Sequence, residues 1–246
     1  MLAEKERRRK PRRDRGPRLT PRDLVLLRWM GEQYALRFDQ IQQLLARFST
    51  GATLTPGRVS ESTARHTIDR WEIAGLVVYK KILADEPGYC WVTPAGLRTA
   101  GLPFRAFVPQ PSNLRHLFWC VQARLALTAR YPTWSWRSER WLRTELDQRI
   151  KSVKLPDALL VAEDGRTIAV EVELTQKNSI KLEEIMKART LVYAQTVYFA
   201  PPAIARVLSR IRDQLDDIDA RKVVIQLLEE NDPHENPFQP GAAAPV

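Results

Sequence analysis

Apolar residues in the first third of the chain recur with helical spacing. Thr20 is a good N-cap and Pro21 suits a first helical position, so a helix is expected from there to about Gly31, with Leu24, Leu26, Leu27 and Met30 as its apolar positions. A second helix is expected around residues 38–45. A third begins after Ser60 or Ser62 and ends at Gly75. Its predicted inward face is Ala64, Ile68, Trp71 and Ala74.

Two short strands are predicted directly after the third helix. They cover residues 76–80 and 89–93 and flank a polar loop at residues 85–88. Three helices followed by such a hairpin are typical of a winged helix-turn-helix, here residues 19–102, whose third helix enters the DNA major groove. The expected DNA contacts are Thr63, Arg65, His66, Arg70, Lys80 and Lys81. The alternative is a winged helix that serves protein interaction.

The pattern changes after residues 103–111, which hold three prolines and are interpreted as an interdomain linker. Residues 112–228 then predict a helix at 114–130, a strand at 134–139 and two strands around a turn at Asp164-Gly165. A helix at 178–193, a strand at 196–200, a helix at 203–215 and a strand at 223–228 follow. The predicted order is α-β-β-β-α-β-α-β. The fold class is an α/β domain in a chain that is α+β overall, and residues 229–246 are expected to be disordered.

Composition is that of a soluble globular protein: 44% of the 246 residues are hydrophobic and 28% are charged. No apolar run approaches the ~18 residues that would predict a membrane span, and residues 1–18 lack the apolar segment of a secretory signal. Cys90 and Cys120 lie in unlike contexts, which indicates neither a disulfide framework nor a zinc site. A reducing, cytoplasmic location without a membrane partner is expected.

The basic excess lies mostly at the N-terminus. Residues 1–18 hold nine Lys/Arg and three Asp/Glu, a net charge of +6 out of +10 for the chain. Such a segment has little to bury, so disorder is expected, and it attracts polyanions. Lys/Arg side chains that neutralise phosphates give salt-sensitive affinity for nucleic acid, and double-stranded DNA is the predicted partner. The alternative is a solubilising arm.

Acidic residues mark the ends of the two strands around Asp164-Gly165. Asp157 opens the first strand, and Glu171 and Glu173 share one face near the end of the second. Lys177 follows, and Glu139 ends the preceding strand. Carboxylates hold hard cations that activate water for phosphodiester hydrolysis, so these residues predict a Mg²⁺ or Mn²⁺ site with Asp157, Glu171 and Glu173 as ligands. The alternative is that the acids are merely solvated. His116 is expected to be a buried, hydrogen-bonded histidine.

The pattern Pro156-Asp157, thirteen residues, then Glu171-Val172-Glu173, in an α-β-β-β-α-β order, resembles the PD-(D/E)xK restriction-endonuclease-like superfamily. Residues 20–228 as a whole resemble the replication-relaxation family of plasmids and other mobile elements. That resemblance rests on the winged helix and on four short motifs: Asn113-Leu114-Arg115-His116, Ser138-Glu139, Pro156-Asp157-Ala158 and Glu171-Val172-Glu173-Leu174.

The superfamily resemblance implies that Asp157 and Glu171 bind the metal and that Glu139 adds a further acid. Glu173 departs from the pattern, because it stands where the superfamily has lysine. Lys177, or less favourably Lys154, is the candidate replacement.

The expected function is therefore DNA binding in plasmid replication or mobilisation, with replication or mobilisation proteins as partners. Metal-dependent cleavage or nicking of DNA is the expected activity. The alternative is a non-catalytic accessory factor or transcriptional regulator with a degenerate nuclease fold.

Overall fold

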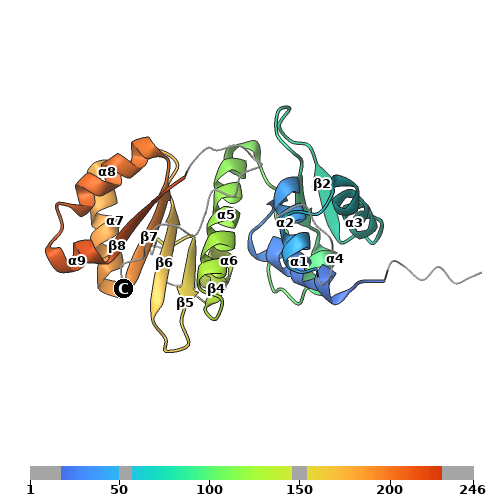
Figure 1. The fold of residues 1–246 in the computed structure, drawn as a ribbon, viewed down its shortest axis with the longest axis horizontal. Coiled ribbons are helices and arrows are strands. Elements are labelled where there is room, and N and C mark those ends of the chain that lie inside the picture. The colour runs from blue at the N-terminus through green and yellow to red at the C-terminus, as the bar shows by residue number, and fades with distance from the viewer. Residues whose placement is uncertain (1–17, 50–56, 146–153, 229–246) are drawn as a thin grey trace, which may run out of the picture.

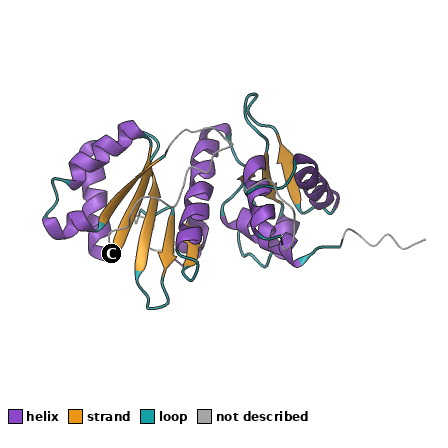
Figure 2. Ribbon diagram, in the orientation of Figure 1, coloured by secondary structure: helices purple, strands orange, loops and turns teal. Residues whose placement is uncertain are grey.

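The computed structural model describes residues 18–49, 57–145 and 154–228. Within these ranges the chain is a mixed α/β protein with two separate sheets, one near each end of its long axis (Figure 2). The sequence prediction of an α+β chain is confirmed at this level.

The N-terminal lobe, which comprises residues 18–49 and 57–102, packs three longer helices and one short helix against a small antiparallel sheet. Its elements are α1 (Pro21–Glu32), β1 (Leu36–Arg37), α2 (Phe38–Arg47), α3 (Glu61–Ile73), β2 (Val77–Lys80), β3 (Tyr89–Val92) and α4 (Pro94–Thr99). The strand order is β1-β3-β2. Fully buried side chains from all three helices, among them Leu27, Ile41, Ile68 and Trp71, form the core of this lobe.

Local sequence signals set the helix ends. Thr20 and Asp23 form a capping box at the start of α1, with Pro21 in the first turn. The Ser60 hydroxyl accepts from the Thr63 amide at the start of α3. Gly75 follows α3 with φ +67°, a left-handed conformation that glycine adopts without the penalty of a Cβ. The predicted inward face of α3 is confirmed for Ala64, Ile68 and Trp71, which are buried.

The C-terminal lobe, residues 111–145 and 154–228, contains one five-stranded mixed sheet. A short 3₁₀ turn (Pro111–Asn113) leads into α5 (Leu114–Arg130), and the strands are β4 (Ser135–Ser138), β5 (Ala158–Val161), β6 (Thr167–Val172), β7 (Gln195–Ala200) and β8 (Val223–Leu227). The remaining helices are α6 (Glu139–Glu145), α7 (Ser179–Val192), α8 (Pro202–Arg212) and α9 (Asp217–Arg221). The sheet order is β4-β5-β6-β7-β8, antiparallel from β4 to β6 and parallel from β6 to β8.

Helices cover both faces of this sheet (Figure 1). Val170 and Val172 of β6 and Phe199 of β7 pack with Trp119 and Ala123 of α5 on one face. On the other face, buried residues of β7 and β8 pack with α7 and α8, including Leu182, Met186, Tyr198, Leu208 and Val223. Because side chains alternate along a strand, Glu171 points away from the α5 face and toward α7.

Helix α5 belongs to both lobes. Val121 is part of the N-terminal core, whereas Ala123 and Leu127 belong to the core against the sheet. Glu32 of α1 pairs with the largely buried Arg124 of α5 at 2.7 Å. The Gln40 side-chain amide donates to the Phe118 carbonyl at 2.9 Å. These contacts fasten the two lobes along one helix.

The proline-rich segment predicted as a linker also makes contacts with its surroundings. The Phe104 ring lies 4.9 Å from the Trp141 ring, and the Phe107 ring lies 4.7 Å from the Tyr34 ring. The Arg105 carbonyl accepts a hydrogen bond from Arg140 of α6. The segment is therefore packed against α6 and against Tyr34, which lies between α1 and β1, as well as connecting the lobes.

The predicted element order is confirmed, with boundaries shifted by a few residues. The prediction omitted β1, α4, α6 and α9, which are all seven residues or shorter. The predicted disordered tails lie outside the described residues, apart from Arg18. No helix among the described residues has the length and apolar character needed to cross a membrane.

Candidate functional site

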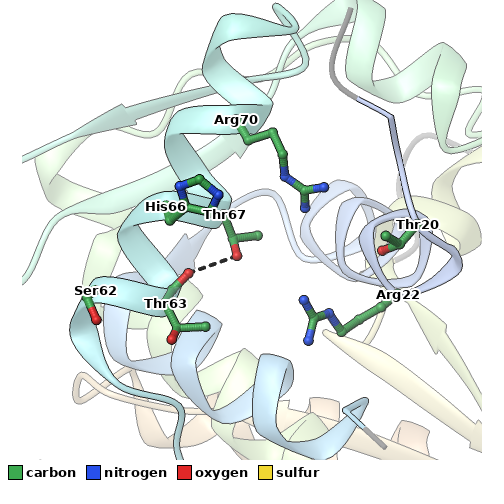
Figure 3. Close-up of a pocket in the computed structure, with 7 residues that line it drawn as sticks. All are labelled: Thr20, Arg22, Ser62, Thr63, His66, Thr67 and Arg70. Atoms are coloured by element: carbon green, nitrogen blue, oxygen red, sulfur yellow. Dashed lines mark hydrogen bonds between the residues drawn. The ribbon is translucent and has the colours of Figure 1, made fainter.

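The first candidate site is an open groove between α1 and α3, with a volume of about 470 Å³ (Figure 3). We call it the α1–α3 groove. It is lined by two arginines, one histidine and four hydroxyl residues: Thr20, Arg22, Ser62, Thr63, His66, Thr67 and Arg70. None of these seven residues is acidic. The groove thus offers hydrogen-bond donors and positive charge, which are the groups that contact phosphates.

A buried acid beneath the groove fixes one of its arginines. Arg70 Nη2 lies 2.6 Å from Oδ1 of Asp23, which has no exposed surface. Asp23 also accepts from the Trp71 indole at 3.0 Å and from the Thr20 amide at 2.7 Å. Burial alone would raise the pKa of Asp23, but the hydrogen bonds from Thr20 and the charge of Arg70 outweigh it and lower that pKa. Arg70 therefore keeps a fixed position beside the groove.

The remaining groove residues differ in how firmly they are held. The Thr67 hydroxyl donates to the Thr63 carbonyl at 2.9 Å, and Arg22 Nη1 donates to the Ser49 hydroxyl at 2.6 Å. His66 and Ser62 are exposed. The sequence predicts Thr63, His66 and Arg70 as DNA contacts, and all three line the groove. Thr20 and Arg22 were not among the predicted contacts, because the packing of α1 on α3 brings them to the groove.

The other predicted DNA contacts lie beside the groove on the hairpin side of α3. The Arg65 guanidinium stands over the rings of Phe38 and Tyr79, at 4.7 and 4.5 Å from their centroids. Lys80 ends β2, and both Lys80 and Lys81 are exposed. Gly88, near the end of the hairpin loop, has no room for a side chain, because a Cβ there would meet the Tyr79 ring. The hairpin is thus packed closely to α2 and α3.

The second candidate site surrounds Asp157, at the start of β5. Asp157 Oδ2 accepts from the Val172 amide at 2.7 Å, and its Oδ1 lies 3.2 Å from Nε2 of His116. The same Nε2 lies 3.4 Å from the Cys120 sulfur. The candidate ligand atoms of His116, Cys120 and Asp157 all lie within 4.8 Å of one another. We call these three residues the Asp157 cluster.

Helix α5 supplies two members of this cluster, since His116 and Cys120 are four residues apart on one helix face. The His116 side chain is 40% exposed, so the expectation of a buried histidine is wrong, although the expected hydrogen bond is present. Burial lowers the pKa of His116, but the hydrogen bond to Asp157 and the charges of Asp157 and Glu139 outweigh this effect. The pKa of His116 is therefore raised overall. Burial, with nearby carboxylates, raises the pKa of the Cys120 thiol well above its usual value.

Glu171 is held on the opposite face of β6. Arg189 of α7 donates to Glu171 Oε1 from Nε at 2.9 Å, and both side chains are about 8% exposed. Burial and the charge of Asp157 raise the pKa of Glu171, whereas Arg189 and Lys154 oppose the rise. Asp157 and Glu171 therefore interact electrostatically, but Arg189, which sequence reasoning did not identify, is the direct partner of Glu171.

Glu173, Lys177 and Glu139 also have protein partners. Buried Glu173 forms an ion pair with Lys177. Glu139 accepts from the Tyr34 hydroxyl at 3.2 Å and pairs with Arg143 one turn later on α6. The predicted residues are therefore gathered at one end of the β5–β6 pair. Lys177 forms its ion pair with Glu173. Among the described residues, no contact of Lys177 with Asp157 or Glu171 is found.

This donor set fits Mg²⁺ or Mn²⁺ poorly. Mg²⁺ prefers carboxylate, phosphate and water oxygens in near-octahedral geometry. Around Asp157 the structure instead supplies an imidazole nitrogen and a thiol. Glu171 and Glu173, the other predicted ligands, are engaged by Arg189 and Lys177. The expectation of a hard-cation site formed by these three acids does not agree with the geometry.

Comparison of the chain with protein-family models, with curated proteins and with solved structures finds no match.

Proposed function

We propose that this protein binds duplex DNA through its N-terminal lobe, with α3 as the recognition helix of a winged helix-turn-helix. The observation that carries the proposal is the α1–α3 groove, whose seven described lining residues bring hydroxyl, imidazole and guanidinium groups together without an acid. In such a fold, an outer helix face reads the major groove while nearby donors grip phosphates.

The arrangement around α3 supports this role. Helix α3 buries one face in the core of the N-terminal lobe, and the helix lies at the end of the molecule that is remote from the five-stranded sheet (Figure 1). The hairpin of β2 and β3 lies beside it, with Lys80 and Lys81 exposed in the position of a wing. The basic residues 1–17, which lie outside the described ranges, would add sequence-independent affinity for phosphates.

Binding of a fluorescently labelled duplex, followed by anisotropy across a salt series, tests the proposal. We expect the affinity to fall steeply with salt, since counterions are released from the phosphates. His66→Glu places a negative charge in the groove and is expected to weaken binding at least about tenfold, because like charge at a binding surface costs several kcal/mol. Ala203→Glu adds the same charge in the first turn of α8 and should leave affinity unchanged.

Two results would reject the proposal. One is an affinity that does not depend on salt. The other is an equal loss of binding in His66→Glu and Ala203→Glu, which would mean that the groove has no special part in binding.

For the C-terminal lobe we propose an accessory role in plasmid replication or mobilisation, carried by a nuclease-like fold; the role in these processes comes from the resemblance of the sequence alone. The order is α5, β4, α6, β5, β6, α7, β7, with β7 parallel to β6. Apart from the seven-residue α6, this order is compatible with the α-β-β-β-α-β arrangement of the PD-(D/E)xK superfamily. Its acids, however, are engaged: Arg189 holds Glu171, and Lys177 holds Glu173 at the position where that superfamily has lysine. This arrangement favours a lobe that binds or assembles.

DNA cleavage is the second candidate function. It is favoured by the place of the two acids at one end of the β5–β6 pair, where the Asp157 carboxylate accepts from the amide of Val172, the residue that follows Glu171. Neighbouring carboxylates are the groups that hold divalent cations at sites of phosphodiester hydrolysis. Incubating supercoiled plasmid with the protein and divalent metal ions, beside Asp157→Ala, tests it. Nicking by the wild type and not by Asp157→Ala would establish cleavage, whereas no nicking, or equal nicking by both, would exclude it.

A further inference from the structure

We propose that His116, Cys120 and Asp157 form a binding site for a borderline transition-metal ion, Zn²⁺, with one coordination position left for water. The proposal concerns the C-terminal lobe and does not depend on DNA binding by the N-terminal lobe. It also replaces the hard-cation site that the sequence predicts.

The distances carry the first step. A tetrahedral Zn²⁺ with ligand bonds of about 2.0–2.3 Å places neighbouring ligand atoms about 3.3–3.8 Å apart. In the structure, His116 Nε2 lies 3.2 Å from Asp157 Oδ1 and 3.4 Å from the Cys120 sulfur, and the three candidate ligand atoms all lie within 4.8 Å of one another. The two distances from His116 are therefore close to those between ligands of one ion.

The second observation is that His116 uses the same ring nitrogen toward both of its neighbours. One nitrogen, Nε2, is directed at both a carboxylate oxygen and a sulfur. A single N–H cannot make a linear hydrogen bond to both. A metal ion between the three groups satisfies all of them at once, because an unprotonated imidazole, a thiolate and a carboxylate are all metal ligands.

The same geometry argues against a cysteine nucleophile. In a Cys–His–acid triad the histidine uses one ring nitrogen for the nucleophile and the other for the acid. Here Nε2 faces both Cys120 and Asp157.

The orientation of Asp157 is the third step. Its Oδ2 accepts from the Val172 amide at 2.7 Å, so Oδ1 is left facing His116 and Cys120. A hydrogen bond that fixes the non-ligating oxygen is the arrangement that orients metal-binding carboxylates in other proteins. Since the side chains of His116 and Asp157 are 40% and 21% exposed, solvent can reach the fourth position.

Co²⁺ titration of the full-length protein, without a polyhistidine tag, tests the site. Co²⁺ takes the geometry of Zn²⁺ and has a visible spectrum, and a cysteine ligand adds a sulfur-to-metal charge-transfer band in the near ultraviolet. We expect one Co²⁺ per chain with that band, and its displacement by one equivalent of Zn²⁺. Cys120→Ser should abolish the band, and His116→Gln and Asp157→Asn should each weaken metal binding at least about tenfold.

Two matched variants control for the other ligand types. Cys90→Ala removes the second cysteine, and His66→Gln removes the histidine in the α1–α3 groove; both should retain the band. Circular dichroism of each variant shows that it is folded. A wild-type protein that gives no charge-transfer band, or a band of unchanged intensity in Cys120→Ser, would overturn the proposal. DNA affinity measured on the same samples reports separately on the proposed function.

Discussion

Two aspartates in this protein differ in burial and in how many hydrogen-bond donors their carboxylates accept from. Asp23, below the α1–α3 groove, has no exposed surface and accepts from Thr20, Arg70 and Trp71. Asp157, at the start of β5, accepts one backbone amide and shares His116 with Cys120. Asp23 is saturated with donors and so holds the fold together. Asp157 has one oxygen that a ligand can still take.

The two arginine-bound acids extend the comparison. Arg70 ties Asp23 to α3, and Arg189 ties Glu171 to α7. In both places the guanidinium compensates a buried carboxylate, which otherwise would be costly to bury. The Asp157 cluster differs, since the described residues place no guanidinium on Asp157. Buried, saturated acids are therefore structural, and the partly exposed, unsaturated acid is the candidate ligand.

Substitution of Asp23 is expected to have the largest effect on stability. Asp23→Asn removes the charge opposite Arg70 and cannot accept all of the present donors, so we expect a loss of about 3–5 kcal/mol in the free energy of unfolding. Urea unfolding followed by tryptophan fluorescence measures it. Asp164→Asn, at the exposed β5–β6 turn, is the matched control and should leave the midpoint close to wild type. Equal midpoints for the two variants would contradict the structural role of Asp23.

The acid dependence of unfolding tests the same aspartate. The folded state lowers the pKa of Asp23, through contacts with Thr20, Arg70 and Trp71 that outweigh burial. Its contribution to stability is therefore complete above the unfolded pKa of about 3.9 and is lost as the pH falls through the lower folded value. We expect the wild-type midpoint to approach that of Asp23→Asn as the pH is lowered from 6 to 2. A constant difference between them would contradict this sign.

The Glu171–Arg189 pair is expected to give a smaller loss. Arg189→Met leaves Glu171 buried without its donor, at a cost of about 2–3 kcal/mol, and the raised pKa of Glu171 lets it take up a proton and limit that cost. Glu171→Gln in the same chain removes the stranded charge and should restore part of the stability. Urea midpoints of the two single variants and the double variant measure the coupling. Additive effects would show that the pair is not coupled.

Removal of the Asp157 charge should have the smallest effect on the metal-free protein. Asp157→Asn retains an oxygen for the Val172 amide, so we expect a loss of about 1 kcal/mol or less in the free energy of unfolding. The same urea unfolding measurement in the presence of a chelator gives the value. A loss as large as that of Asp23→Asn would contradict this expectation and would mean that Asp157, like Asp23, mainly stabilises the fold.

The sequence was most informative where a local pattern determines the structure. The capping residue Thr20, the terminating Gly75 and the turn at Asp164-Gly165 all lie where they were expected, because each acts on its immediate neighbours. Short elements such as β1 and α6 were missed. They are two and seven residues long, and their positions depend on pairing with distant parts of the chain.

The candidate sites were predictable only in part, for a related reason. The acids Asp157, Glu171 and Glu173 were found because charge is unusual at the ends of buried strands. Arg189 and Cys120 were not linked to these acids, because both are distant in the sequence. Arg189, on α7, lies 18 residues after Glu171, and Cys120, on α5, lies 37 residues before Asp157. The i, i+4 spacing of His116 and Cys120 was the available signal for the Asp157 cluster.

The most direct test of the contrast between the two aspartates is the urea midpoint with and without Zn²⁺, for wild type, Asp23→Asn and Asp157→Asn. A ligand that binds only the folded state stabilises it by about 2.7 kcal/mol at 100 times its dissociation constant. We expect Zn²⁺ to raise the midpoint of the wild type and of Asp23→Asn, which starts much lower. Since Asp157→Asn weakens metal binding at least about tenfold, the same Zn²⁺ concentration should stabilise that variant by no more than about 1.4 kcal/mol. A wild type that does not respond to Zn²⁺, or an Asp157→Asn variant that responds like wild type, would contradict these expectations.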